Sequence, residues 1–229
     1  MKQPRDRGRI DWRRVEAELD QEGYAVLPGL LRLSPGDLAA MRTDALLASL
    51  ESGHLGQGSL YVLPLHLPSV LQDLRDLLYR GLAPVANRWN ELLGRNVICP
   101  SELSELVDRS RPSRLNRSPG SLTVLRDGDY LALHQRSDGT EVFPLEAVAL
   151  LTQPGRDFTG GEFVMVEQRP RMQSRPIVVP LSPGSVAIIA SGERPQRGTK
   201  GHYRVNLKHA ISRVRGGERI GLEFLLATR

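Results

Sequence analysis

The stretches GDYLALHQ (128–135) and GHYRVNLKHAIS (201–212) each have the composition of a β-strand that carries a histidine near its end. Similar short runs fill the chain from residue 121 onward and alternate with Gly/Pro turns. About eight such runs occupy the last 109 residues: 121–126, 129–135, 143–153, 161–168, 174–181, 184–191, 202–212 and 220–227. Their number and spacing predict a β-sandwich or barrel of the jelly-roll kind.

The first half of the chain has a helical pattern instead. Residues 1–10 are expected to form a flexible arm, and residues 11–120 a helical portion that packs on the roll formed by 121–229. Helices are predicted from Asp11 as N-cap to Gly23, from Ser34 to about residue 53, and over about 68–93 with a break near Pro84. Residues 24–31 read as a short strand. The whole is predicted to be one α+β domain.

The composition is that of an ordinary globular protein, with 229 residues, 40% hydrophobic and 25% charged. The single cysteine, Cys99, excludes an internal disulfide and a multi-cysteine metal cluster, which favours a reduced, cytoplasmic compartment. The N-terminus lacks the apolar region of a secretory signal, and no apolar run is long enough for a bilayer. A net charge of +5 is compatible with nucleic-acid binding, although solvated surface arginine is the favoured interpretation.

Two histidines on two strands indicate a candidate metal site. A non-haem Fe(II) centre takes two imidazoles and one carboxylate on one face of the metal and leaves the other face open. If the first strand continues, alternation places Tyr130, Ala132, His134 and Arg136 on one face. The carboxylate usually follows the first histidine by two residues, but this position holds Arg136, which has no acceptor and cannot bind iron.

Arg219 is a candidate anion-binding residue. It follows His209 by ten residues, and a three-residue loop at the glycine pair 216–217 would place it on the same face as His209. A two-residue turn would place it on the opposite face. If it points inward, its guanidinium can bind a carboxylate in a bidentate manner. Tyr130 is a further pocket candidate, with a packed strand aromatic as the alternative.

Longer runs around these residues resemble a bacterial family of 2-oxoglutarate–Fe(II) oxygenases, proposed on sequence grounds to act in repair of damaged or alkylated DNA. The runs are GLAPVANRWNELLG (81–94), GDYLALHQ (128–135), QPGRDFTGGEFVMVEQRPRMQSR (153–175) and GTKGHYRVNLKHAISRVRGGER (198–219). The resemblance covers nearly the whole chain from about Gly23. It implies a cupin-like double-stranded β-helix, with iron bound by His134 and His209 and 2-oxoglutarate bound by Arg219.

The chain departs from that family at pocket positions. The family's GDYNCLHQDLYG is GDYLALHQRSDG here, so that an asparagine becomes Leu131, the iron-binding aspartate becomes Arg136, and the following LY becomes Ser137–Asp138. The family's GRGEYRYF corresponds to GQGSLYVL (56–63), and its FHDA to FLLATR (224–229). The scaffold runs are kept while the pocket has changed, which indicates altered chemistry.

Three interpretations of Arg136 follow. In the favoured one the iron stays, and Arg136 holds a negative group of the substrate near the metal. In the second, another acid becomes the ligand, with Asp138 closest in sequence, although SDGT (137–140) is also typical of a turn in which aspartate caps backbone donors. In the third the metal is lost and Arg136 fills its place, which requires an acidic neighbour or an anionic ligand because a buried arginine is costly unpaired.

The predicted function is a mononuclear non-haem iron oxygenase that uses O₂ and oxidises a small, anionic molecule of a specialised pathway. Its electrons are expected to come from 2-oxoglutarate or from the substrate itself. The alternatives are a catalytically silent roll that binds an anionic ligand or nucleic acid, and a dioxygenase that repairs DNA bases.

Overall fold

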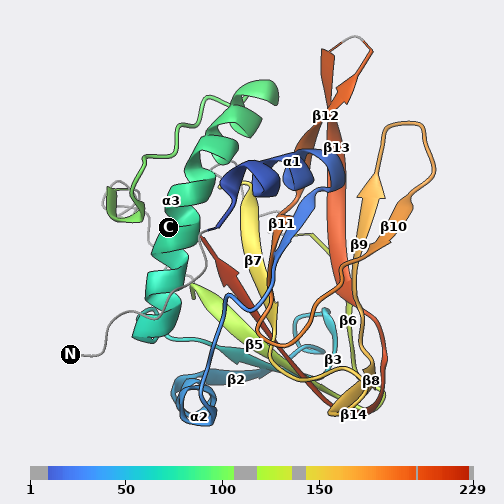
Figure 1. Cartoon of the computed structure of the whole chain (residues 1–229). Coiled ribbons are helices and arrows are strands. Elements are labelled where there is room, and N and C mark those ends of the chain that lie inside the picture. The colour runs from blue at the N-terminus through green and yellow to red at the C-terminus, as the bar shows by residue number, and fades with distance from the viewer. Residues whose placement is uncertain (1–9, 106–117, 136–142, 200, 227–229) are drawn as a thin grey trace.

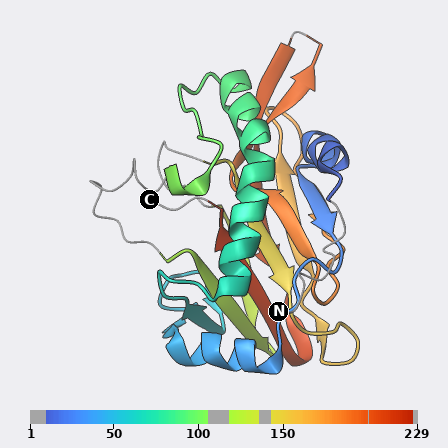
Figure 2. The same ribbon diagram turned by 60° about the vertical axis from the view of Figure 1, so that its left-hand side comes forward.

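The computed structural model describes residues 10–105, 118–135, 143–199 and 201–226, and in them two antiparallel sheets face each other (Figure 1). The long helix α3 (Ser69–Leu92) lies along the outer side of the sandwich, as the turned view in Figure 2 shows. The predicted jelly roll, the fold of a double-stranded β-helix, is confirmed. In the described part of the chain no helix is both long and apolar enough to span a membrane.

The larger sheet has the strand order β1-β11-β7-β14-β5-β4-β2, with β8 also paired to β14. Its strands are β1 (Tyr24–Leu27), β2 (Leu46–Ser49), β4 (Ser59–Val62), β5 (Gly120–Arg126), β7 (Leu145–Leu150), β8 (Phe158–Gly160), β11 (Val186–Ala190) and β14 (Val214–Leu225). All six residues of β7 and all five of β11 are buried. These two strands are covered on both faces, which explains their nearly continuous apolar sequence.

The smaller sheet has the order β10-β9-β13-β6-β3, with β12 paired to β13. Its strands are β3 (Gly56–Gln57), β6 (Tyr130–His134), β9 (Phe163–Gln168), β10 (Arg175–Val178), β12 (Glu193–Gly198) and β13 (Gly201–Ile211). Alternate residues are buried along β9 and along the second half of β13. This period of two marks strands with one face in the core and one toward solvent.

The predicted helix ends are confirmed where capping chemistry decides them. In α1 (Trp12–Glu22) the Asp11 side chain accepts a hydrogen bond from the Arg14 N–H, and Gly23 ends the helix with φ 79°. In α2 (Pro35–Asp44) Ser34 and Asp37 form a reciprocal capping box. The cap residues therefore specify where both helices begin.

Four expectations were wrong in detail. Helix α2 ends at Asp44 instead of about residue 53, because residues 46–49 pair with β4 as a strand. Helix α3 continues through Pro84, since apolar residues on both sides of the proline are buried in the core. Two short strands, β8 and β12, were not predicted. In the first half, β2, β3 and β4 were not predicted either, whereas β1 confirms the short strand expected within residues 24–31.

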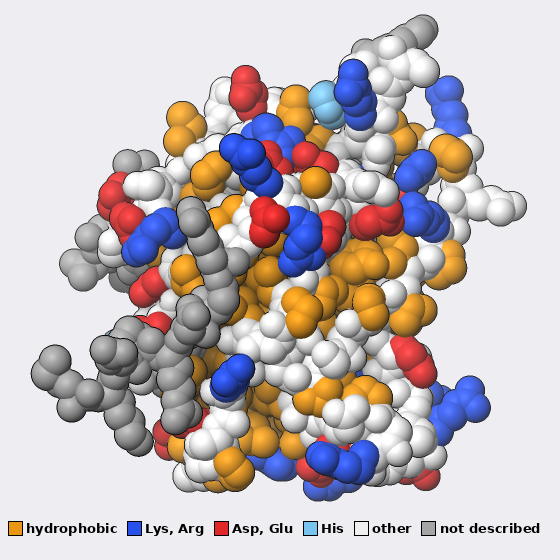
Figure 3. All heavy atoms as spheres, in the orientation of Figure 1, with side chains coloured by type: hydrophobic (Ala, Val, Ile, Leu, Met, Phe, Trp, Pro, Cys, Tyr) orange, Lys and Arg blue, Asp and Glu red, His pale blue; other side chains and the backbone are white. Residues whose placement is uncertain are grey.

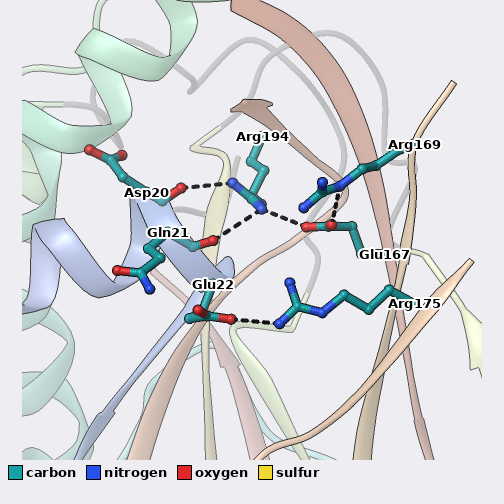
Figure 4. A network of polar contacts seen from close by, with 7 residues as sticks. All are labelled: Asp20, Gln21, Glu22, Glu167, Arg169, Arg175 and Arg194. Carbon is teal, nitrogen blue, oxygen red and sulfur yellow. Dashed lines mark hydrogen bonds and ion pairs between the residues drawn. The ribbon is translucent and has the colours of Figure 1, made fainter. Parts of the chain in front are cut away.

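A buried ion pair joins α1 to the smaller sheet (Figure 4). Arg194 and Glu167 are both 0% exposed, and Arg194 Nη2 donates to Glu167 Oε2 at 2.5 Å. Arg194 Nη1 also donates to the carbonyl of Asp20 at 2.8 Å, which satisfies one of the unpaired carbonyls at the end of α1. Burial opposes ionisation of Glu167, but hydrogen bonds from Arg194 and Arg169 outweigh it and lower the pKa of its carboxyl.

Neutralising Glu167 is expected to destabilise the protein strongly. Glu167→Gln leaves the buried Arg194 without its counter-charge, and such a loss costs about 3–5 kcal/mol. The loss of stability is measured as the decrease in the free energy of unfolding in urea. The matched control is Glu22→Gln, which removes the partly exposed pair with Arg175 seen in the same figure and is expected to cost less than about 1 kcal/mol. Equal losses of unfolding free energy in the two variants would contradict a stabilising role for the buried Arg194–Glu167 pair.

Candidate metal centre

The two strands that carry the site belong to opposite sheets. β13 pairs with β6, β9 and β12, while β14 pairs with β5, β7 and β8. The predicted hairpin between them, with a turn at the glycine pair 216–217, is therefore wrong. These glycines lie inside β14, and the chain crosses between the sheets at residues 212–213. Inward side chains of β13 and β14 consequently face each other across the interior.

His134 reaches the interior through a register shift. His134 lies opposite His209, whereas Leu131 lies opposite Ile211, so β6 has one more residue than β13 between these pairs. The expectation that Tyr130, Ala132 and His134 share a face is therefore corrected, because Leu131 and His134 both pair with buried residues of β13. The Nδ1 of His134 lies 2.9 Å from the Ala132 carbonyl. A carbonyl only accepts, so Nδ1 carries the proton and the Nε2 lone pair is left for a ligand.

His209 is fully enclosed, with 1% of its surface exposed. Its ring meets the His134 ring edge to face, with centroids 4.2 Å apart and an interplanar angle of 67°. Phe163 stacks against it at 5.5 Å. Two carboxylates of the larger sheet lie on either side of the imidazole. Glu146 Oε1 is 3.6 Å from Nδ1, and Glu223 Oε1 is 4.0 Å from Nε2.

His134, His209 and Glu223 form a group that can hold one metal ion. Each offers one ligand atom, and these atoms all lie within 4.8 Å of one another. Neighbouring ligand atoms on one ion are roughly 3–4 Å apart, given metal–ligand distances of about 2.1 Å. Two imidazoles and one carboxylate are also the donor set of non-haem Fe(II) sites that keep open positions for O₂ and substrate. The residues present therefore fit a mononuclear iron ion.

Arg219 lies on the same strand as Glu223 and is 2% exposed. Its Nε donates to the Gly161 carbonyl at 2.8 Å, while Nη1 is buried and has no partner among the described residues. Burial lowers the pKa of the guanidinium to about 10, although nearby Glu162 opposes the shift, so Arg219 is charged at neutral pH. A buried cation with an unused N–H group is suited to bind a carboxylate.

Two glycines make room for this side chain. A Cβ on Gly221 would lie 2.7 Å from Arg219 Nη1, and one on Gly161 would lie 2.8 Å from Arg219 Cδ. The guanidinium thus extends over the backbone at Gly221, in the direction of Glu223. Arg219 and the carboxylate of the candidate metal group consequently lie near each other on β14.

The other predicted residues are placed as follows. The Arg213 guanidinium carbon lies 5.5 Å from the centre of the Tyr130 ring, and a pocket role for Tyr130 stays a prediction. Arg136 and Asp138 lie outside the described residues.

Sequence reasoning missed both carboxylates beside His209. Glu146 stands within the apolar run PLEAVALL (144–151), and Glu223 within IGLEFLL (220–226). An acid inside a run of buried strand residues was the available signal, because a buried carboxylate needs a cation or hydrogen-bond donors.

One family model and an uncharacterized relative match most of the chain. The model of the family Oxygenase-NA, described as an oxygenase catalysing oxidative methylation of damaged DNA, matches residues 58–228. An uncharacterized protein of Mycobacterium tuberculosis, Rv2227, is 35% identical over 161 residues, which are 70% of this chain and 69% of that protein. The residues matched by the family model, 58–228, include His134, His209, Arg219 and Glu223.

The fold is shared with solved oxygenases. A 2OG-Fe(II) oxygenase family oxidoreductase from Burkholderia pseudomallei has a TM-score of 0.50 and 18% identity, covering 95% of this chain and 91% of that one. A Pseudomonas putida prolyl-4-hydroxylase has a TM-score of 0.52 and 15% identity, covering 91% of this chain and 94% of that one. At these identities the likeness concerns the fold.

Filling the space beside Arg219 is expected to impair carboxylate binding. In Gly221→Ala the added methyl meets Nη1 and displaces the guanidinium. We expect the affinity for 2-oxoglutarate to fall by at least about tenfold, or 1.4 kcal/mol, in calorimetric titration of the Mn(II)-loaded protein. Gly216→Ala is the control, since a Cβ there on the same strand meets only Thr159 Oγ1 at 3.5 Å and should leave the affinity unchanged. Unchanged affinity in Gly221→Ala would argue against Arg219 as the anion site.

Proposed function

Since this chain belongs to the Oxygenase-NA family, we propose that it is a mononuclear oxygenase whose iron is held by His134 and His209 and whose 2-oxoglutarate is held by Arg219. The family model confirms the predicted oxygenase. The predicted cofactors, Fe(II) and 2-oxoglutarate, are those of the solved oxygenases that share the fold.

One observation carries the proposal. The ring centroids of two imidazoles on adjacent strands lie 4.2 Å apart between the sheets, and a buried arginine with an unused N–H group lies on β14 of the facing sheet, four residues before Glu223. Two imidazoles and one carboxylate suit a divalent cation, and the unused N–H group of the arginine suits a carboxylate of 2-oxoglutarate.

The residues divide the chemistry between them. Bound Fe(II) and 2-oxoglutarate would supply the activation of O₂. One oxygen atom of O₂ would enter succinate as CO₂ leaves 2-oxoglutarate. The other oxygen atom would oxidise the substrate, which gives up two electrons. His134 is oriented by its hydrogen bond to the Ala132 carbonyl, and His209 by packing on Phe163. Arg219 fixes the far carboxylate. The enclosure of His209 and Arg219 keeps bulk water from the reacting groups.

For the substrate we propose a small molecule. Leu131, at a position where related proteins have a polar residue, is buried opposite Ile211 and makes that wall of the interior apolar. Many surface arginines are also engaged by acids, as in the pairs Arg88–Asp20 and Arg14–Glu18. Basic and acidic side chains are accordingly interspersed over the part of the surface around α1 (Figure 3). Such pairing weakens the positive field that phosphate binding requires.

Damaged DNA is the second candidate, and the description of the family model favours it. Its electrostatic signature is distinctive, because a protein that binds nucleic acid releases counterions, and a higher salt concentration makes this release less favourable and weakens binding steeply. Fluorescence anisotropy with a methylated single-stranded oligonucleotide, measured over a series of salt concentrations, distinguishes DNA from a small molecule as the substrate. Absence of binding at low salt supports the small molecule, and tight, salt-sensitive binding supports DNA.

The iron site is tested by substitution of its histidines. We expect anaerobic wild-type protein to bind about one Fe(II) per chain, and His134→Ala and His209→Ala to lose it, since each removes one of two imidazole ligands. Iron content after gel filtration measures this. His202→Ala, an exposed histidine on the same strand as His209, should retain full binding.

Arg219→Leu completes the series. It should keep the iron but lose 2-oxoglutarate binding and the O₂-dependent formation of succinate. No iron in the wild-type protein would overturn the proposed function, and Arg136 and Arg219 would then be tested as anion binders.

A further inference from the structure

We propose that Glu223 is the carboxylate ligand of the iron, supplied by β14 in place of the acid that the sequence resemblance leads one to expect at position 136. This rests on the proposed function, because it names the third protein ligand of the same metal. The third ligand then comes from the sheet opposite the two histidines, which clamps the ion between the two layers.

The geometry of the side chains supports this role. Glu223 Oε1 lies 4.0 Å from His209 Nε2, and a donor atom of His134 completes the group within 4.8 Å. The carboxylate is 8% exposed and the two imidazoles belong to adjacent strands. A carboxylate this close to two imidazoles needs only a small side-chain movement to share one ion with them.

The backbone of β14 fixes the position of Glu223. Glu223 lies opposite Ser121 of β5 and Val148 of β7, so pairing on both edges holds its register. A slip of one residue would turn it to the outer face. The four-residue spacing from Arg219 keeps both side chains on the inner face, and Gly221 between them has no side chain to separate them. Metal ligand and 2-oxoglutarate ligand are therefore adjacent on one strand.

Glu146 has a different role. It faces Nδ1 of His209 at 3.6 Å, whereas Glu223 faces Nε2 on the other side of the ring. An imidazole that binds a metal through one nitrogen commonly directs the other toward a carboxylate, which fixes the ring orientation. Glu146 is thus a positioning residue behind His209, and Glu223 lies on the side of the metal.

The test compares the two acids by the same substitution. Co(II) alone is titrated into the full chain under anaerobic conditions, and its affinity and visible absorption spectrum are recorded. Glu223→Gln should lower the affinity for Co(II) by at least about 100-fold and change the visible absorption spectrum, because an anionic oxygen ligand is lost. Glu146→Gln should weaken the Co(II) affinity less, by about 10- to 100-fold, and keep the wild-type spectrum, as expected for a residue outside the coordination sphere.

A second variant tests the relocation itself. Adding Arg136→Asp to Glu223→Gln places a carboxylate at the position where related proteins have it. Recovery of Co(II) affinity to within about tenfold of the wild type is the expected result. Unchanged affinity and spectrum in Glu223→Gln, with binding lost in His134→Ala and His209→Ala, would overturn this proposal and leave the two-histidine site intact. No Co(II) binding in the wild type would instead overturn the proposed function.

A direct measurement covers the case in which a variant does not fold. Crystals of the wild-type protein grown with Co(II) locate the ion by its anomalous scattering. The proposal expects a Glu223 oxygen in the coordination sphere together with His134 and His209. An ion bound by both histidines without Glu223 would overturn it.

Discussion

The structure depends on the crossing of the chain from one sheet to the other between β13 and β14. Backbone hydrogen bonds hold this crossing on both sides. Ser212 N–H donates to the Glu162 carbonyl at 2.9 Å, and Val214 N–H donates to the Asp129 carbonyl at 2.9 Å. Because the crossing is short, His209 at the end of β13 and the inner face of β14 are brought against each other. The site exists because two consecutive strands are in different layers.

This arrangement divides the chemistry between the layers. The imidazoles come from the smaller sheet, while Arg219, Glu223 and Glu146 come from the larger one. Polar groups in a sandwich interior reduce stability unless they are paired, so they are tolerated where a ligand satisfies them. The Arg194–Glu167 pair is satisfied within the protein and joins α1 to the smaller sheet. Arg219, by contrast, keeps an N–H group for a ligand.

Membership of the Oxygenase-NA family and an arginine at position 136 are compatible if the carboxylate has moved. Metal binding depends on the position and charge of the ligand atoms, whichever strand carries each ligand. A glutamate on β14 meets this requirement with a longer side chain that spans the space between the sheets. Residue 136 lies outside the described residues, so a role for Arg136 in holding a negative group of the substrate stays a prediction from the sequence.

The sequence by itself determined the strand-rich second half and the caps at Asp11 and Ser34, and it singled out His134, His209 and Arg219 as candidate site residues, because periodicity, capping and long family motifs are local signals. Only the tertiary structure decided that 216–217 lies within a strand, that a register shift turns His134 inward, and that Glu146 and Glu223 face His209. Position 146 is 63 residues from 209 along the chain, and the packing of the two sheets against each other brings them together. Which side chains of each sheet face the interior depends on the long-range register of its strands, which composition and spacing within one strand do not contain.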